Sequence, residues 1–302
     1  MKKIGVGLVV IVVIYVDDLI ITRSDKDGIM HVKKMLGAKF DMKDLGELKY
    51  FLGIEVVRTP QGIWMLQRQY VLDMLQKYGM TACKPIATPM EQNVKLRPDV
   101  GEVLEDPTMY RKIVGSLIYA TLTRPYMCHD VGVLSQFMQV PWKSHLDAAH
   151  RVLRYAKSML NYELFYAYGM DIEVFGYTDA DWAGCSYDRR STSGYVFSFG
   201  SGAVSWRSKK QPTVALSSTE AEYRGAAMVA ACEIAWLRKL LHDLGYVDLG
   251  PVTLYCDNMS SIQLANNPVF HARTKHFEVH YHYVHEKVLA GDIDMVYVST
   301  QD

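Results

Sequence analysis

The sequence predicts an α/β protein in which a mixed five-stranded sheet with flanking helices, over residues 171–302, follows an N-terminal part of hairpins and helices. Three observations predict this class. Short runs rich in β-branched and aromatic residues alternate with helical stretches after residue 172. Gly200-Ser201-Gly202 joins two of these runs as a hairpin, whereas the later runs are reached through helices, so the sheet should be mixed. A length of 302 residues suits about two domains.

The composition is that of an ordinary globular protein. Hydrophobic residues make up 49% and charged residues 22%, which excludes a disordered chain. Lys plus Arg and Asp plus Glu each number 33, so the net charge is zero and a globally basic nucleic-acid binder is excluded; any such binding needs local patches. The five cysteines show no CxxC spacing, which argues against a zinc knuckle or a disulfide framework.

The N-terminal apolar run imitates a signal peptide. It covers residues 6–16 behind two lysines, but it is too short to span a membrane, which needs about 20 residues. Asp17 and Asp18 follow it in place of a small-residue cleavage site. We expect an intracellular protein that is not secreted and has no membrane contact; secretion or anchoring through this run is the alternative. An exposed apolar strand at 8–14 would make the chain poorly soluble.

Each element of the N-terminal part follows from local patterns. Gly79 is a candidate helix C-cap, Pro125 ends a helix, and Ser144 with Asp147 is a candidate capping box. The predicted elements are a strand–turn–strand at 8–22, a helix at 25–40, strands at 48–59 and 62–67, a helix at 68–78, a proline-containing linker at 83–107, and helices at 110–123 and 144–160.

The C-terminal part has its own set of elements. Strands are predicted at 172–178, 194–199, 203–206, 252–257 and 293–298, and helices at 218–242, 260–266 and 274–289. Ser217 with Glu220 is a second candidate capping box. We divide the chain into residues 1–106, 107–170 and 171–302.

Three acids stand at the ends of these elements. Asp179 is predicted to end the first strand, Asp257 the fourth, and Glu222 lies in the first turns of the long helix. Ligands gather where strands end in α/β folds, and converging carboxylates suit Mg²⁺ or Mn²⁺. Glu222 has small or apolar residues at i+3, i+4 and i+7, so its side chain should face the sheet. Glu220 has Arg224 at i+4, so it should form an ion pair on the surface. The choice between Asp179 and Asp181 stays open on this reasoning.

These residues belong to motifs that resemble a known family. The motifs YTDADWAG (177–184), RRSTSGYVF (189–197), SWRSKKQPTVALSSTEAEY (205–223), LYCDN (254–258) and RTKHFEVHYHYVHEK (273–287) resemble the ribonuclease H domain of copia-type retrotransposon Pol polyproteins. Upstream, YVDDLIIT (15–22), KDLGELKYFLGIEV (43–56), CKPIATPM (83–90) and YRKIVGSLIYATLTRP (110–125) resemble the end of the same family's reverse transcriptase.

The resemblance implies a fold, a reaction and a ligand set. It implies a reverse-transcriptase palm and thumb remnant over 1–106, a helical connection over 107–170 and a ribonuclease H-like domain over 171–302. Asp179, Glu222 and Asp257 look like the carboxylates that hold Mg²⁺ or Mn²⁺ and hydrolyse RNA in an RNA–DNA hybrid, and this selects Asp179 over Asp181. Asp17 and Asp18 look like the aspartates of the polymerase palm turn.

The chain departs from the family pattern at both ends. It begins close to the YVDD turn, so we expect no polymerase activity from it. The family's fourth acid follows the last strand, where this sequence stops at Asp302; Asp302 and Glu278 are the fallback candidates. The alternative to a working nuclease is a catalytically dead, nucleic-acid-binding remnant of a decayed element.

Histidines and basic residues complete the candidate site. Five histidines lie within residues 271–285, and His276 with His280 has i, i+4 spacing, but no third metal ligand or HExxH motif accompanies them. A polar helix face, or histidines such as His276 and His282 near a substrate phosphate, is the favoured interpretation. The basic residues, expected in loops that meet phosphates, are Arg189, Arg190, Arg207, Lys209 and Lys210.

Overall fold

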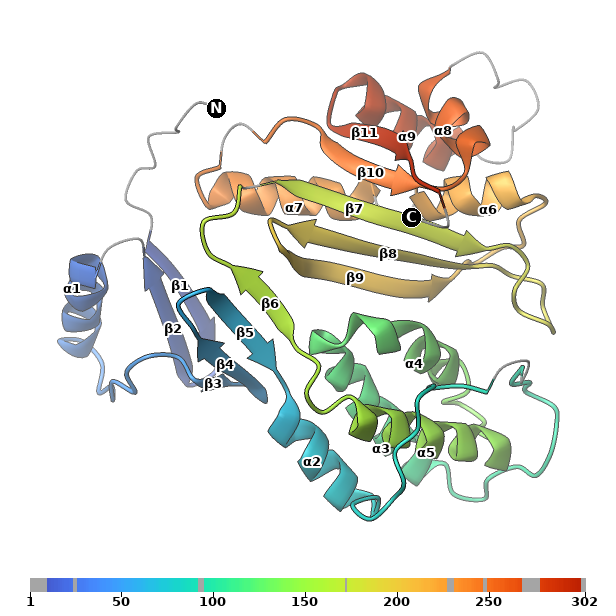
Figure 1. Ribbon diagram of the computed structural model, residues 1–302, viewed down its shortest axis with the longest axis horizontal. Helices are drawn as coiled ribbons and strands as arrows, with labels where there is room; N and C mark the ends of the chain where they lie inside the picture. The colour runs from blue at the N-terminus through green and yellow to red at the C-terminus, as the bar shows by residue number, and fades with distance from the viewer. Residues whose placement is uncertain are drawn as a thin grey trace.

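The computed structural model describes residues 10–23, 26–91, 95–171, 173–226, 231–246, 249–267 and 278–299. Within these ranges the strands form three sheets, of two, four and five strands. Figure 1 shows the five-stranded sheet and its helices on one side of the molecule and a group of helices, α2 to α5, on the other. The N-terminal hairpin stands beside both.

The hairpin pairs β1 (Val10–Tyr15) with β2 (Asp18–Arg23). Tyr15 lies opposite Asp18, so Val16 and Asp17 form a two-residue turn, and the predicted strand–turn–strand is confirmed. Val16 has a φ of 49°, a strained conformation for a β-branched residue. The side chains from Val12 to Val16 are exposed, as expected for an apolar strand with no cover. The helix α1 (Lys26–Gly37) follows, as predicted.

The four-stranded sheet joins segments far apart in the sequence. Its order is β3 (Tyr50–Phe51), β4 (Ile54–Arg58), β5 (Gly62–Leu66) and β6 (Leu164–Ala167). The single strand predicted at 48–59 is wrong, because the chain turns at Leu52 and Gly53, where both φ values are positive. Strand β6 was not predicted, because its four residues are too few to show a period of two.

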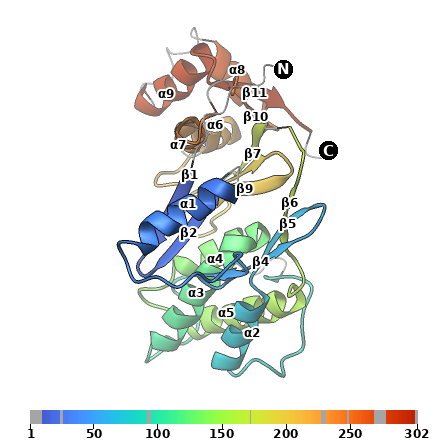
Figure 2. The same cartoon turned by 90° about the vertical axis from the view of Figure 1, so that its left-hand side faces the viewer.

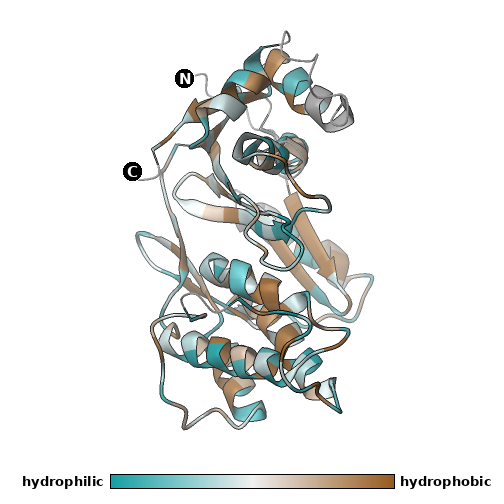
Figure 3. Cartoon of the chain, turned by 90° about the vertical axis from the view of Figure 1, so that its right-hand side faces the viewer, coloured by the Kyte–Doolittle hydropathy of each residue, from teal (hydrophilic) through white to brown (hydrophobic). Residues whose placement is uncertain are grey.

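The helices α2 (Arg68–Lys77), α3 (Thr108–Ala120), α4 (Cys128–Ser135) and α5 (Lys143–Ser158) share one core. Leu75, Ile113 and Leu153 are among its fully buried side chains. Figure 3 shows apolar and polar residues on different sides of these helices, as amphipathic packing requires. Helix α5 begins one residue before the predicted start, so the predicted capping box is wrong. The Nδ1 atom of buried His145 accepts a hydrogen bond from the Trp142 backbone N–H at 3.0 Å instead.

The five-stranded sheet has the order β11 (Ile293–Tyr297), β10 (Val252–Cys256), β7 (Val174–Asp181), β8 (Thr192–Phe199) and β9 (Gly202–Lys210). Strands β7, β8 and β9 are antiparallel, and β10 is parallel to both β7 and β11. This confirms the predicted mixed sheet of five strands.

Four helices cover one face of this sheet. They are α6 (Ser218–Gly225), α7 (Ala231–Asp243), α8 (Met259–Asn266) and α9 (Glu278–Leu289). Their core includes Phe197, Ile234, Leu254 and Met295 and is separate from the core of α2 to α5. Figure 2 shows these helices stacked at one end of the molecule. The predicted helix at 218–242 is described as two segments, α6 and α7. The three-part division of the chain remains a proposal.

None of the helices in the described ranges is long and apolar enough to cross a membrane.

Candidate metal centre

The acids meet where two parallel strands separate. Strand β10 pairs with β7 only from Thr253 to Tyr255, opposite residues 175–177, while β7 continues to Asp181. The N–H groups of this extension that face β10 therefore have no strand partner. One of them, the Ala180 N–H, donates to Glu222 Oε1 at 3.1 Å. The end of the pairing thus makes room for a side chain from α6.

Glu222 enters this space from helix α6. Ser217 caps the helix by accepting a hydrogen bond from the Glu220 N–H at 3.1 Å. The predicted capping box forms only in part, because Glu220 Oε2 accepts from the Leu216 N–H and not from that of Ser217. Glu220 pairs with Arg224 at 2.9 Å on the other side of the helix, which leaves Glu222 to face the sheet. The Glu222 side chain is buried, as its spacing predicted, with 6% of its surface exposed.

The second carboxylate oxygen of Glu222 is unsatisfied. Oε2 is buried and has no hydrogen-bond partner in the part of the chain that the structure describes. Burial, with the nearby charges of Asp179 and Asp257, raises the pKa of Glu222 to about 8, and the Ala180 hydrogen bond opposes this rise. A buried acceptor without a donor is costly, so this oxygen requires a proton or a cation.

Asp257 and Asp179 flank Glu222. Asp257 directly follows β10, two residues past the last β7–β10 pair, and Asp179 lies two residues past the same pair on β7. Ligand atoms of Asp257, Glu222 and Cys256 lie within 4.8 Å of one another, and Asp257 is half-buried. Asp179 is exposed on β7, and its charge acts on Glu222. The structure therefore brings all three predicted acids together.

Asp181 has a structural role in the sheet. Its carboxylate accepts a hydrogen bond from the Thr192 N–H and so closes the end of the β7–β8 pair. Burial raises the pKa of Asp181. The prediction that Asp179 ends the first strand is wrong, because β7 runs on to Asp181.

The donor set fits a hard divalent cation. Three carboxylates, one with an unsatisfied buried oxygen, supply the ligands that Mg²⁺ and Mn²⁺ prefer. Cys256 could suggest a softer metal, but its side chain is fully buried in the core and its sulfur contacts Ser261 Oγ at 3.4 Å. Burial raises the pKa of the Cys256 thiol, which keeps it protonated and unsuitable as a ligand.

Gln211 supports this site and was missed by the sequence analysis. It is 5% exposed. Its Nε2 donates to Ser193 Oγ at 2.8 Å and to the Ala221 carbonyl at 2.9 Å. Ser193 lies opposite Ala180, and Ala221 precedes Glu222. Gln211 therefore ties the two partners of the Ala180–Glu222 hydrogen bond together. A glutamine before a proline indicates only a loop, so the sequence carried no signal for this role.

The basic residues lie partly where they were not expected. Arg207, Lys209 and Lys210 belong to strand β9, so their prediction as loop residues is wrong. Lys210 Nζ is 2.8 Å from Asp188 Oδ2 and 2.9 Å from Cys185 Sγ, which ties β9 to the β7–β8 loop. Arg190 lies 3.8 Å from the same aspartate, and Arg189 is exposed with a φ of 59°.

The remaining predicted residues lie apart from the acids or outside the described part. Asp17 and Asp18 are exposed on the hairpin, and among the described residues they belong to no group of three metal ligands. His276 and Asp302 lie outside the described residues. Glu278 and His282 lie on α9, but their side chains are outside the description.

Comparisons with known proteins identify the family. A family model described as "Reverse transcriptase (RNA-dependent DNA polymerase)" matches residues 1–92. The chain is 44% identical over 294 residues, or 97% of its length, to the retrovirus-related Pol polyprotein from transposon RE1 of Arabidopsis thaliana, of which it covers 20%. It is 39% identical over 312 residues, or 100% of its length, to the corresponding polyprotein from transposon TNT 1-94 of Nicotiana tabacum, of which it covers 23%.

One solved structure is similar to part of this chain. It is a ribonuclease H1, LC11-RNase H1, in complex with an RNA/DNA hybrid, with 12% identity and a TM-score of 0.33 over 43% of this chain and 87% of that one. The chain spans about a fifth of the length of the curated polyproteins it matches. On the strength of those relatives, the chain belongs to the family of retrovirus-related Pol polyproteins of copia-type transposons.

Proposed function

We propose that this chain hydrolyses the RNA strand of an RNA–DNA hybrid in a reaction that depends on Mg²⁺ or Mn²⁺. The observation that carries the proposal is the buried Oε2 of Glu222, which accepts no hydrogen bond from a described residue and belongs to a carboxylate on which the charges of Asp179 and Asp257 act. Such an arrangement is unfavourable in the absence of a cation and favourable in its presence. We place the reaction inside the cell: in the cytoplasm, a virus-like particle or the nucleus.

Three residues would bind the metal, and two others hold these ligands in position. Asp179, Glu222 and Asp257 would hold the ion through their oxygens. A divalent ion in such a site supplies an activated water and charge stabilisation for the phosphodiester. The Ala180 N–H fixes Oε1 of Glu222 and leaves Oε2 as the oxygen that would hold the ion. Gln211 holds the strand and the helix that make this contact.

The test is cleavage of a hybrid labelled on its RNA strand, with Mg²⁺, by the wild type and by Asp257→Asn. We expect cleavage by the wild type and its loss in the variant. Asp243→Asn, which removes an exposed carboxylate at the end of α7, is the matched control and should cleave normally. A wild type that binds the hybrid but leaves it intact would refute the proposal and identify a catalytically dead binding remnant.

Polymerisation is not part of the proposed function. Asp17 and Asp18 occupy an exposed two-residue turn and its flank, with no third metal ligand near them among the described residues. We expect no extension of a primed RNA template by this chain, and extension would show that the hairpin forms a working metal site.

A further inference from the structure

Lys210 ends strand β9 at the end of the sheet where the acids lie. It pairs with Thr192, the first residue of β8, which in turn pairs with Asp181, the last residue of β7. These three residues form one row across the sheet, two residues along β7 from the row that holds Asp179. A side chain that fixes this row therefore fixes the strand ends on which the candidate metal centre is built.

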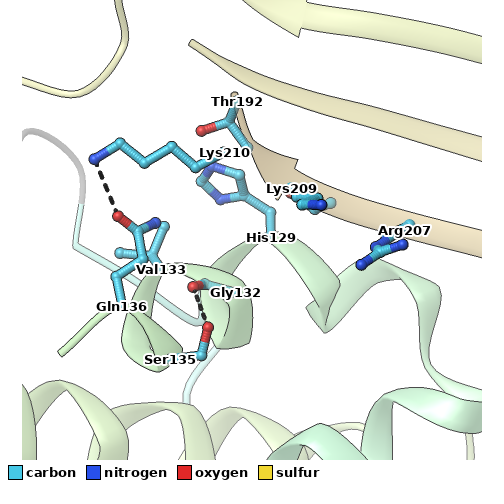
Figure 4. A pocket seen from close by; sticks show the side chains of 10 residues that line it. His129, Gly132, Val133, Ser135, Gln136, Thr192, Arg207, Lys209 and Lys210 are labelled. Carbon is cyan, nitrogen blue, oxygen red and sulfur yellow. Dashed lines mark hydrogen bonds between the residues drawn. The ribbon is translucent and has the colours of Figure 1, made fainter. Parts of the chain in front are cut away.

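The ammonium group of Lys210 joins β9 to two other segments of the chain. Figure 4 shows the side chain extending from β9 toward α4, where Nζ donates to Gln136 Oε1 at 3.2 Å. The other acceptors lie in the β7–β8 loop, and they are Asp188 Oδ2 at 2.8 Å, Cys185 Sγ at 2.9 Å and Tyr187 OH at 3.1 Å. Only 13% of the Lys210 side-chain surface is exposed, so these contacts enclose it.

These contacts keep Lys210 charged and fully engaged. Burial by itself would lower the pKa of Lys210, but its bonds to Asp188, Cys185 and Tyr187 outweigh burial and raise that pKa. An ammonium group has three N–H donors, and the four acceptor atoms named above already lie within 3.2 Å of this one. Lys210 could meet a phosphate only by giving up one of these partners, which favours a role within the protein.

The residue that follows Lys210 supports the metal centre directly. Gln211 donates from its backbone N–H to the Ser191 carbonyl at 2.8 Å. Its side chain donates to Ser193 and to the Ala221 carbonyl on α6. Successive residues of a strand point to opposite faces of a sheet. Lys210 is accordingly anchored on the face toward α4 and Gln211 on the face toward α6, with one peptide unit between the two anchors.

We propose that Lys210 is a positioning residue for the metal centre. It fixes the end of β9 to α4 and to the β7–β8 loop and so sets where Gln211 lies. Gln211 in turn sets the contact between the Ala180 N–H and Glu222. Lys210 thereby makes the metal affinity depend on α4, a helix whose core is separate from that of the five-stranded sheet. The inference rests on the proposed function in taking the three acids as the metal ligands.

The first test requires neither metal nor substrate. Lys210→Met keeps an unbranched side chain but removes its charge and its donors. In EDTA, the Ala180 amide should exchange its hydrogen about threefold faster or more in Lys210→Met than in the wild type, because Glu222 is held less firmly. Lys239→Met removes an exposed lysine on α7, and this matched control should exchange as the wild type does. Equal exchange in Lys210→Met and the wild type would overturn the proposal, whatever the cleavage result.

Mn²⁺ titration tests whether Lys210 acts on the metal centre through Gln211. Lys210→Met should bind Mn²⁺ about three- to tenfold more weakly, at or below the lower end of the loss expected for a direct partner of a metal ligand. The losses in Lys210→Met and Gln211→Met should not add, so the double variant should bind Mn²⁺ as Gln211→Met does. Additive losses, or an undiminished affinity in Lys210→Met, would overturn the proposal.

Hybrid binding separates positioning from contact with the nucleic acid. In EDTA, Lys210→Met should bind a fluorescent RNA–DNA hybrid with the same dependence on salt as the wild type, because no phosphate contact is lost. A smaller salt dependence in Lys210→Met would overturn the proposal in favour of a phosphate contact.

Two further measurements separate this role from loss of folding and from the nuclease activity. If thermal melting shows that Lys210→Met does not fold, Asp188→Asn removes only the charge of the partner and should weaken Mn²⁺ binding in the same direction. Unchanged Mn²⁺ binding in Asp188→Asn would then overturn the proposal. A wild type that binds Mn²⁺ without cleaving the hybrid would refute the proposed function, whereas the exchange and Mn²⁺ results would still decide the role of Lys210.

Discussion

The chain carries two sets of acids in contrasting surroundings. Asp17 and Asp18 stand on a two-stranded hairpin whose apolar side chains are exposed. Glu222 is buried between a helix and the separated ends of two strands, beside Asp179 and Asp257. Only the second set has an unsatisfied buried oxygen and a strongly raised pKa. The difference teaches that an acidic motif becomes a metal site through the packing that gathers and desolvates its carboxylates.

The largest difference should appear in catalysis. Asp179→Asn should lower Mg²⁺-dependent hybrid cleavage by more than about a hundredfold. Removing a residue that only hydrogen-bonds to a metal ligand already lowers metal affinity or activity by about 10- to 100-fold, and Asp179 would be a ligand itself. Asp17→Asn and Asp18→Asn should leave the rate unchanged. Single-turnover cleavage of one labelled hybrid by all three variants measures this. An equal loss of cleavage rate in Asp179→Asn and in the two hairpin variants would contradict this prediction.

The next largest effect concerns Gln211, which positions Glu222. Gln211→Met removes both hydrogen bonds from Nε2 and should weaken divalent-metal binding by about tenfold or more. Calorimetric titration with Mn²⁺ separates this from a loss of stability, which thermal melting reports. Gln263→Met, at an exposed position of α8, is the control and should bind Mn²⁺ as the wild type does. An unchanged Mn²⁺ affinity in Gln211→Met would remove this residue from the site.

A pH dependence should distinguish the buried acid from the exposed pair. The pKa of Glu222 in the folded protein, about 8, is above the ordinary glutamate value of 4.5, so the folded state binds this proton more tightly than the unfolded state. The stability of the metal-free protein should therefore fall as the pH rises from about 4.5 through about 8, by at most roughly 1.4 kcal/mol per unit of raised pKa.

Chemical denaturation in EDTA between pH 5 and 9 measures this fall. Glu222→Gln carries no titrating group at this position and should lose less stability over the same range. Asp18→Asn should follow the wild type. If Glu222→Gln and the wild type lose the same stability, the burial of this carboxylate does not govern the pH dependence.

The smallest effect concerns the hairpin itself. Val16→Gly removes the backbone strain of a β-branched residue held at a φ of 49°. It should therefore stabilise the β1–β2 pair by about 1 kcal/mol or less. Val13→Gly, inside β1, should destabilise the pair by a similar amount. Hydrogen exchange of the hairpin amides reports both changes, and neither should alter hybrid cleavage. Less protection in Val16→Gly than in the wild type would contradict the strain.

Much of the site could be predicted from local sequence. Residue spacing along α6 identified Glu222 as the inward acid, because helix faces are set by neighbours three and four residues away. The end of β7 was misplaced because Asp179 and Asp181 disfavour strands, whereas Thr178 and Ala180 on the buried face extend the pairing. The register of β7 against β10, which creates the site, is a long-range feature that no local pattern contains.

The parts that were missed depend on contacts between distant segments. Three basic residues close together in the sequence suggested a loop. They lie instead on an edge strand beside a helix, where such residues can be accommodated: Arg207, Lys209 and Lys210. Strand β6 is defined by its pairing with β5, about a hundred residues earlier. Gln211 acts through a side chain on a neighbouring strand and a helix carbonyl, neither of which is near it in sequence.

Metal binding tests the central claim most directly, because it requires neither substrate nor turnover. Mn²⁺ binding, followed by electron paramagnetic resonance at pH 8.5, should reveal a site in the wild type and in Asp17→Asn/Asp18→Asn. The same site should be absent from Glu222→Gln, whose amide cannot neutralise the ion. Undiminished Mn²⁺ binding in Glu222→Gln, or its loss in the hairpin variant, would contradict the account.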